Sequence, residues 1–209
     1  MPPTTSELVQ RRQQRCLQLI ADISDRTPAP RRRPDVVFLE RTSGPSRGRF
    51  SWRHDRITLV IPGFLDDPSL PDDAIDAVVA HEMGHWADPD VAAESRRAVV
   101  VGIPILMAGA ALLLASLLLS PIPSAVAILA GAVACVAAFY AMACFSWPGE
   151  ERADRFAVEQ VGAEAVVAML ESTPKKAARG ISPTHPSVRR RTILAREAGI
   201  PPESAPDRG

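Results

Sequence analysis

The feature that most constrains this chain is an uncharged block of 48 residues, from Ala98 to Phe145. Within the block 39 residues are apolar, and every Asp, Glu, Lys and Arg of the chain lies outside it. A helix needs about 20 apolar residues to cross the roughly 30 Å hydrocarbon core of a bilayer, so the block has room for two. A chain of 209 residues rarely encloses so long an uncharged segment in a soluble core. The block therefore predicts a transmembrane helical hairpin.

We expect the first span from Ala98 to about Leu119 and the second from about Ile122 to Phe145, with a break at Pro121–Ser124. Basic residues next to a span favour the cytoplasmic side. Arg96 and Arg97 precede the first span, and Arg152 and Arg155 follow the second. The pattern predicts a multi-pass protein of the cell (inner) membrane with both termini cytoplasmic. A buried helical hairpin in a soluble protein is the alternative.

Composition excludes several classes of protein. The apolar content of 46% is too high for a disordered chain, and no fibrous repeat is present. A net charge of +0 argues against nucleic acid as a partner, because such binding needs a basic surface. Three cysteines cannot build a disulfide framework, and Cys135 and Cys144 read as small packing residues of the second span.

Outside the block, the sequence predicts a mainly α fold with a small β-sheet. An amphipathic helix is expected from Ser6 to Asp25, packed in the core or, alternatively, attached to lipid. Strands are expected at Asp35–Leu39 and Arg56–Ile61, and a further helix opens at Pro71. Between the first helix and the first strand, a proline-rich loop holds three arginines that we expect to be solvated, or else to touch anionic lipid: Arg31, Arg32 and Arg33.

The helix after Pro71 carries the chemistry. It reads Ala74-Ile75-Asp76-Ala77-Val78-Val79-Ala80 and then His81-Glu82-Met83-Gly84-His85. Residues four apart share a helix face, so His81 and His85 can hold one zinc ion. Glu82 lies beside them, where its carboxylate can accept a proton from a water that the metal acidifies and pass it to the leaving amine. This pattern predicts a zinc-dependent peptidase with Glu82 as its catalytic base.

A catalytic zinc normally has three protein ligands, so one is still missing. After the second span the chain runs Trp147-Pro148-Gly149-Glu150-Glu151-Arg152-Ala153-Asp154, where Pro148 and Gly149 are expected to end the membrane helix and a new helix to begin. Glu150 and Asp154 share a face of that helix. Glu150 is the expected third ligand, with Asp154 accepting a hydrogen bond from a liganding imidazole. Glu151 is the rival ligand.

Topology supports this pairing. The two membrane crossings lie between His85 and Glu150, and an even number of crossings returns the chain to the same side. Glu150 lies five residues beyond Phe145, about 7–8 Å along a helix. The zinc ion would therefore lie close to the membrane surface, beside substrates in the bilayer.

These residues resemble the HtpX-like and CAAX prenyl protease family of integral-membrane gluzincins. The resemblance rests on the two-histidine motif, a pair of spans, and Glu150-Glu151-Arg152-Ala153-Asp154. Thr184-His185-Pro186 and the arginines that follow are similar to another segment of that family, as is Leu59-Val60-Ile61-Pro62-Gly63-Phe64-Leu65. Unlike the HtpX-like members, this chain has no span before the zinc helix.

The resemblance implies a zincin-like metallopeptidase domain split by the hairpin, with one Zn²⁺ per chain. It implies His81, His85 and Glu150 as ligands, Asp154 as their support, and His185 near the site as a catalytic residue that stabilises the oxyanion. Read without the resemblance, His185 is a helix N-cap with Pro186 at the first helical position. The implied partners are membrane-protein or peptide substrates and the lipid bilayer, in a quality-control role, with the catalytic part cytoplasmic.

The expected organisation is an N-terminal cytoplasmic part at 1–97, the hairpin at 98–146 and a C-terminal cytoplasmic part at 147–209. A strand such as Ile57–Ile61 could bind a substrate backbone at its edge. Two alternatives to an endopeptidase remain. The first is a non-catalytic, metallopeptidase-like membrane protein for signalling or partner binding, which an intact Glu82 disfavours. The second is a plain membrane anchor without metal.

Overall fold

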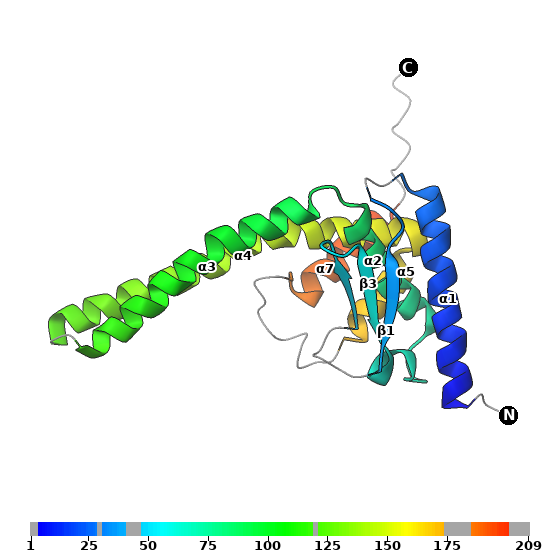
Figure 1. Cartoon of the computed structure of the whole chain (residues 1–209), viewed down its shortest axis with the longest axis horizontal. Helices are drawn as coiled ribbons and strands as arrows, with labels where there is room; N and C mark the ends of the chain where they lie inside the picture. Colours follow the sequence, from blue (N-terminus) through cyan, green and yellow to red (C-terminus); the bar gives the residue numbers. More distant parts are fainter. Residues whose placement is uncertain (1–3, 29–30, 41–46, 119–120, 174–184, 201–209) are drawn as a thin grey trace, which may run out of the picture. The chain divides into compact units, whose positions relative to one another are not determined.

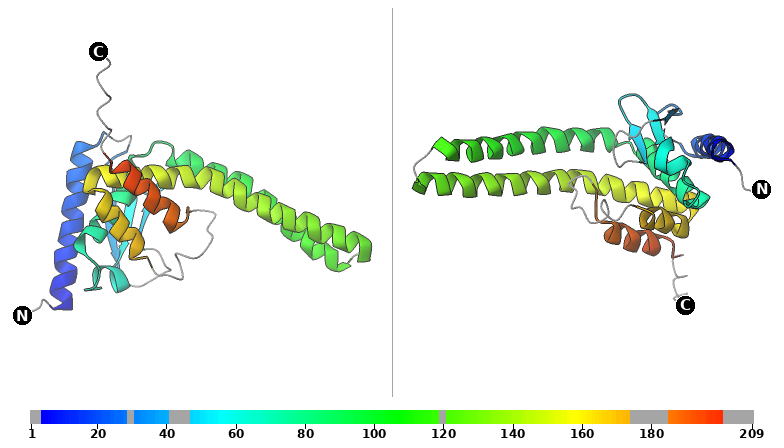
Figure 2. Two further views of the ribbon diagram at one scale, coloured as in Figure 1. Left: turned by 180° about the vertical axis from the view of Figure 1, so that it is seen from behind. Right: turned by 90° about the horizontal axis from the view of Figure 1, so that it is seen from below.

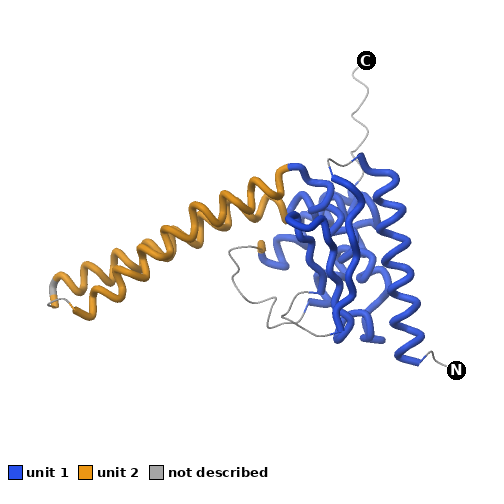
Figure 3. The backbone as a smooth tube through the Cα atoms, viewed as in Figure 1, with its two compact units in different colours: residues 1–89, 151–180, 187–209 blue, residues 90–150, 181–186 orange. Residues whose placement is uncertain are grey.

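The computed structural model describes residues 4–28, 31–40, 47–118, 121–173 and 185–200. These residues are mainly helical and include one three-stranded sheet (Figure 1). The expected fold class is confirmed to that extent. The chain forms two compact units, which Figure 3 colours separately: one draws on 1–89, 151–180 and 187–209, and the other on 90–150 and 181–186. The sequence also predicts a disordered tail from Pro201 to Gly209, and this segment lies outside the described residues.

The sheet of the first unit has the strand order β1-β3-β2. Strand β1 (Asp35–Leu39) runs parallel to β3 (Arg56–Val60), and β2 (Gly48–Ser51) runs antiparallel to it. Because β3 is central, the expectation that Ile57–Ile61 offers a free edge is wrong, and the edge strands are β1 and β2. Strand β2 went unpredicted because its four residues carry no run of β-branched side chains.

Helix α2 (Asp72–Ala87) lies at the centre of this unit (Figures 1 and 2). It packs against α1 (Thr5–Arg26), α5 (Ala163–Glu171) and strand β2. A helix that is apolar nearly all round is typical of a buried position, and the run from Ala77 to Gly84 is buried throughout. The two-histidine motif therefore lies on a buried core helix.

The predicted N-terminal helix is confirmed as α1, and its apolar face packs in the core. The buried residues on that face include Leu8, Cys16, Ile20 and Ile23. Arg12, also buried, donates hydrogen bonds to the carbonyl oxygens of Leu65, Asp67 and Leu70 and to the carboxylate of Asp72. These bonds hold the loop that leads into α2 and so fix where α2 begins.

The second unit is a pair of helices that run side by side (Figure 2). Helix α3 (Val91–Ala115) ends in a short 3₁₀ turn at Ser116–Leu118, and α4 (Pro121–Val161) forms the other arm and continues into the first unit. Gly109 and Gly131 let the two backbones meet, since a Cβ on Gly109 would lie 3.0 Å from the carbonyl oxygen of Gly131. By length and composition, Val91–Leu118 and Pro123–Val161 are apolar enough to cross a membrane, and only 17% of the most apolar window of each is buried.

The expected start of the second apolar helix at about Ile122 agrees with the observed start at Pro121, but the expected break over Pro121–Ser124 and the expected end at Pro148 and Gly149 are wrong. Pro121 is the first residue of α4 and Pro123 lies in its first turn, where the backbone N–H groups have no helical partner and proline costs little. Pro148 lies inside α4 and does not end it, so Glu150 and Asp154 belong to the same helix as the second apolar segment. Proline removes one helical hydrogen bond but its φ angle remains compatible with a helix.

Candidate metal centre

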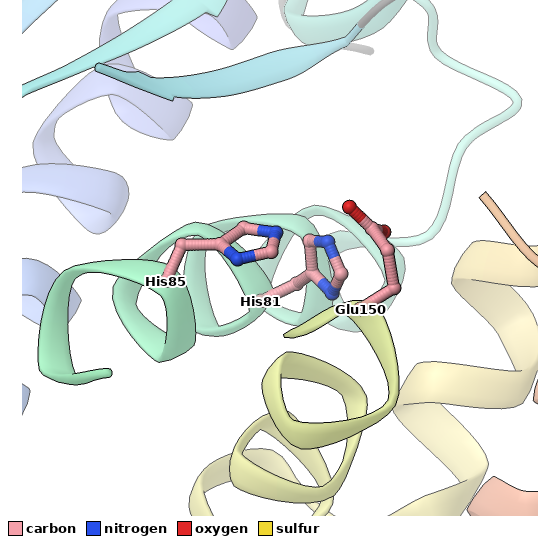
Figure 4. A group of neighbouring side chains, drawn as sticks. All are labelled: His81, His85 and Glu150. Atoms are coloured by element: carbon pink, nitrogen blue, oxygen red, sulfur yellow. The ribbon is translucent and has the colours of Figure 1, made fainter. Parts of the chain in front are cut away.

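His81 and His85 lie on one face of α2, as their spacing predicts (Figure 4). Their ring centroids are 4.8 Å apart and the rings are almost perpendicular, at 84°. His81 is 7% exposed and His85 is partly exposed. Two imidazoles held this close on a buried helix can bind the same ion.

Glu150 brings a carboxylate from α4 to the same point (Figure 4). One ligand atom from each of His81, His85 and Glu150 lies within 4.8 Å of the others, and Glu150 is only 8% exposed. Two imidazole nitrogens and one carboxylate oxygen are a donor set of catalytic zinc sites. The three residues could therefore hold a metal ion, and zinc fits them. Glu151 does not join the group and instead forms an ion pair with Arg190 at 2.7 Å.

Asp154 orients His81. Its Oδ1 lies 2.9 Å from Nδ1 of His81, and both side chains are buried. An ionised carboxylate can only accept a hydrogen bond, so Nδ1 of His81 carries the proton and donates it. The other ring nitrogen, Nε2, then keeps its lone pair for a metal. This contact is the hydrogen bond to a histidine that the sequence predicted for Asp154.

Arg191, on α7 (Val188–Ala198), binds the Asp154 carboxylate that accepts from His81. Its guanidinium donates two hydrogen bonds of 2.6 Å to the carboxylate of Asp154, one from Nε and one from Nη2. Burial by itself would raise the pKa of Asp154, but the hydrogen bonds from Arg191 and His81 outweigh burial and lower the pKa to about 2. Asp154 therefore stays ionised at neutral pH and remains an acceptor for His81.

Sequence reasoning assigned no role to Arg191. Three arginines stand in a row at the start of α7, and the sequence offers no sign of which one is buried. Helical geometry decides it, because Arg190 pairs with Glu151 near the surface while Arg191 turns toward Asp154 and is 12% exposed in its side chain.

We expect Arg191→Met to weaken zinc binding by about 10- to 100-fold, because partners that hold a liganding histidine commonly contribute that much. Without Arg191, the buried carboxylate of Asp154 loses its counter-charge. Zinc affinity is measured by competition with a chelator of known affinity. The matched control is Arg190→Met, which removes a neighbouring arginine from the same helix. Equal affinities in the two variants would contradict the role of Arg191.

Gly84 allows α2 to approach α4 closely. A Cβ at Gly84 would lie 2.7 Å from Cα of Ala153 and 3.0 Å from its carbonyl oxygen, distances that require the backbones to move apart. Ala153 stands between Glu150 and Asp154 on α4. The glycine inside the two-histidine motif therefore sets how near the two acidic residues come to the histidines.

Gly84→Ala is expected to destabilise the fold by roughly 1–3 kcal/mol, as overpacking of a core does, and to weaken zinc binding. Thermal unfolding in detergent and zinc content per chain measure the two effects. Met83→Leu is the control, since it alters the neighbouring buried residue at nearly constant volume. A Gly84→Ala protein with unchanged melting temperature and unchanged zinc content would show that this close approach is not needed.

Glu82 faces the sheet edge. It is 7% exposed, and its Oε2 accepts a hydrogen bond of 2.5 Å from the backbone N–H of Phe50 on β2. Gly48 on the same strand also lies close, since a Cβ there would be 3.2 Å from Cγ of Glu82. The sequence predicted Glu82 as the base but missed β2, and hence missed the strand that holds its carboxylate.

His185 lies beside Glu150, with its Nε2 3.5 Å from Oε1 of Glu150 and its side chain 55% exposed. The reading of His185 as a helix N-cap is wrong. Ser187 is the N-cap of α7, because its side chain accepts a hydrogen bond from the backbone N–H of Arg190. Thr184, the residue before His185, lies outside the described residues.

Two histidines on one helix and a carboxylate on another, with a glutamate adjacent to the first histidine, define a metallopeptidase-type site. A comparison with protein families agrees: the model described as Peptidase family M48 matches residues 58–198. The chain therefore belongs to this family of metallopeptidases. No curated protein and no solved structure matches the chain.

Proposed function

We propose that this protein is a membrane-bound, zinc-dependent endopeptidase that cleaves peptide bonds of membrane or membrane-proximal proteins, in a quality-control role. The observation that carries the proposal is the meeting of His81, His85 and Glu150 within 4.8 Å. Membership of peptidase family M48 supports hydrolysis of peptide bonds. The two long apolar helices support a location in the membrane, where the substrates would be found.

In this proposal His81, His85 and Glu150 hold one zinc ion. When bound, zinc supplies Lewis-acid chemistry that acidifies water and polarises a carbonyl group. Glu82 accepts a proton from the attacking water, whose oxygen bonds to the carbonyl carbon, and delivers that proton to the amine as the C–N bond breaks. Asp154 keeps the proton of His81 on Nδ1, so that Nε2 keeps the lone pair with which it would bind the metal.

His185 is proposed to stabilise the oxyanion that develops on the substrate. Its imidazole lies beside Glu150 and is half exposed, so it can turn its Nε2 toward a bound peptide. A hydrogen-bond donor placed where negative charge develops lowers the barrier of acyl transfer.

The substrate is proposed to bind along β2. This strand is at the edge of the sheet, and the N–H of Phe50 points away from β3 and toward Glu82. An extended peptide that pairs with this edge would present its backbone to the carboxylate of Glu82. The substrate-binding role that the sequence analysis gave to Ile57–Ile61 is thus given to β2.

The test uses the full chain, purified in detergent from washed membranes. Elemental analysis is expected to give one zinc per chain, and an unfolded membrane protein is expected to be cleaved. 1,10-Phenanthroline should abolish cleavage, and added Zn²⁺ should restore it. A chain without zinc, or cleavage that survives the chelator, would refute the proposal. Zinc without cleavage of any substrate would favour the non-catalytic alternative.

Membrane location has its own test. A protein that spans the bilayer stays in the membrane pellet after extraction with alkaline carbonate, whereas a soluble or peripheral protein is released. We expect this chain in the pellet, because α3 and α4 carry many exposed large apolar residues, among them Val100, Met107, Leu114, Leu129 and Val133. Release into the supernatant would contradict the spans and favour a soluble hairpin.

A further inference from the structure

Arg31 closes the C-terminal end of α2. Its Nη1 donates hydrogen bonds to the carbonyl oxygens of Trp86 at 2.9 Å and Asp88 at 3.0 Å, and lies 3.4 Å from that of His85. The last carbonyl groups of a helix have no helical partners and carry partial negative charge, so a guanidinium stabilises them. The expectation of a solvated loop is wrong for Arg31, whose side chain is only 14% exposed.

The same guanidinium also contacts the hairpin of β2 and β3. Its Cζ lies 5.8 Å from the centroid of the Phe50 ring, within the range of a cation–π interaction. Its Nε lies 3.8 Å from Oδ1 of Asp55, in the turn between the two strands. Asp55 has a φ of 44°, a left-handed conformation that non-glycine residues rarely adopt. Arg31 thus joins the end of α2 to both the edge strand and its turn.

These contacts converge on the residue that holds Glu82. The side chain of Phe50 receives Arg31, while the backbone N–H of Phe50 donates to Glu82. Glu82 is one helical turn before Trp86, whose carbonyl Arg31 binds. Arg31 therefore fixes both sides of the contact between β2 and the catalytic part of α2.

We propose that Arg31 is a positioning residue: through Phe50 and the last turn of α2, it sets β2 at the distance at which the Phe50 N–H holds the Glu82 carboxylate. The catalytic meaning of this role rests on the proposed function, because it assumes that Glu82 is the base. Residues 31 and 50 both precede the part of the chain that matches the family model, residues 58–198, so the family match does not assign this role.

A helix cap alone would need only a positive charge at the end of α2. Lysine supplies that charge, but it lacks the planar guanidinium that lies over Phe50 while its other nitrogens serve the carbonyls and Asp55. Arg31→Lys therefore separates the two roles. If Arg31 is only a cap, lysine replaces it; if Arg31 positions β2, lysine fails. The control is Arg32→Lys, which changes an exposed arginine and leaves intact its backbone carbonyl, which accepts a hydrogen bond from the indole N–H of Trp86.

Hydrogen exchange at the Phe50 amide, measured in the metal-free chain by mass spectrometry of β2 peptides, reports the contact without any need for activity. We expect about tenfold faster exchange in Arg31→Lys and in Phe50→Leu, and no change in Arg32→Lys. The double variant should exchange no faster than either single variant, because residues that act through one contact are not additive. In the zinc-loaded enzyme, kcat should fall by about tenfold with KM and zinc content unchanged, as a displaced catalytic group predicts.

Exchange at the wild-type rate in Arg31→Lys would overturn the proposal, whatever the activity of that variant. So would additive effects of the two substitutions, because Arg31 would then not act through Phe50. A wild-type chain that lacks metal-dependent cleavage would refute the proposed function, while the exchange rates would still decide whether Arg31 holds β2. The two failures are therefore distinguishable.

Discussion

Glu82→Gln is expected to retain zinc and to lose cleavage by about 100- to 10,000-fold, the usual contribution of a general base. Glutamine has nearly the size of glutamate, and its amide oxygen can still accept the hydrogen bond from the Phe50 N–H that Glu82 accepts in the structure. The fold and the three ligands should therefore persist, while the side chain can no longer take a proton. Rates on the unfolded membrane-protein substrate, with zinc measured on the same samples, provide the readout.

The matched control is Glu159→Gln, which neutralises an exposed glutamate on α4. It should cleave like the wild type. A Glu82→Gln protein that holds zinc and cleaves at the wild-type rate would show that another group takes the proton, and the assigned mechanism would be wrong.

Glu150→Gln and Glu151→Gln are expected to differ sharply in zinc binding, although the two glutamates are adjacent. Glu150 belongs to the group whose ligand atoms lie within 4.8 Å, whereas Glu151 pairs with Arg190. Replacing the carboxylate of Glu150 by an amide removes the negative charge of the donor set. We expect zinc affinity to fall at least about tenfold in Glu150→Gln, since even residues that only support a ligand contribute that much.

Glu151→Gln should keep wild-type zinc affinity within about twofold, because Glu151 pairs with the half-exposed Arg190 instead of with the ligand group, and such ion pairs contribute little. Chelator competition on the detergent-purified variants gives both affinities. Equal zinc retention by the two variants would exclude Glu150 as the third ligand, and stronger loss in Glu151→Gln would transfer that role to Glu151.

Much of the site followed from spacing along helices. Four-residue separations put His81 with His85 and Glu150 with Asp154, and helix geometry is regular enough for such pairs to be predicted without a structure. The long apolar helices followed from one uncharged block in the same way. These features depend on local periodicity, which a sequence displays directly.

Other features depended on contacts between distant segments. Strand β2 was missed because its stability comes from pairing with β3 and packing on α2, not from its own four residues. The expected edge position of Ile57–Ile61 was also wrong, because the residues of a strand do not show which neighbouring strands will pair with it. The continuation of α4 through Pro148 likewise overrode a local signal that usually ends a helix.

The sequence by itself determined the ligand types, their helical spacing and the apolar segments, because each of these features is a pattern of residues close together along the chain. Only the tertiary structure placed Glu150 rather than Glu151 beside the two histidines, turned Arg191 rather than its neighbours toward Asp154, and placed Arg31 and Phe50 beside the helix that carries Glu82. The physical reason is that a sequence pattern cannot distinguish neighbouring side chains that carry the same charge in one helical turn. They become different only when other segments bury one, pair another and leave the next in solvent.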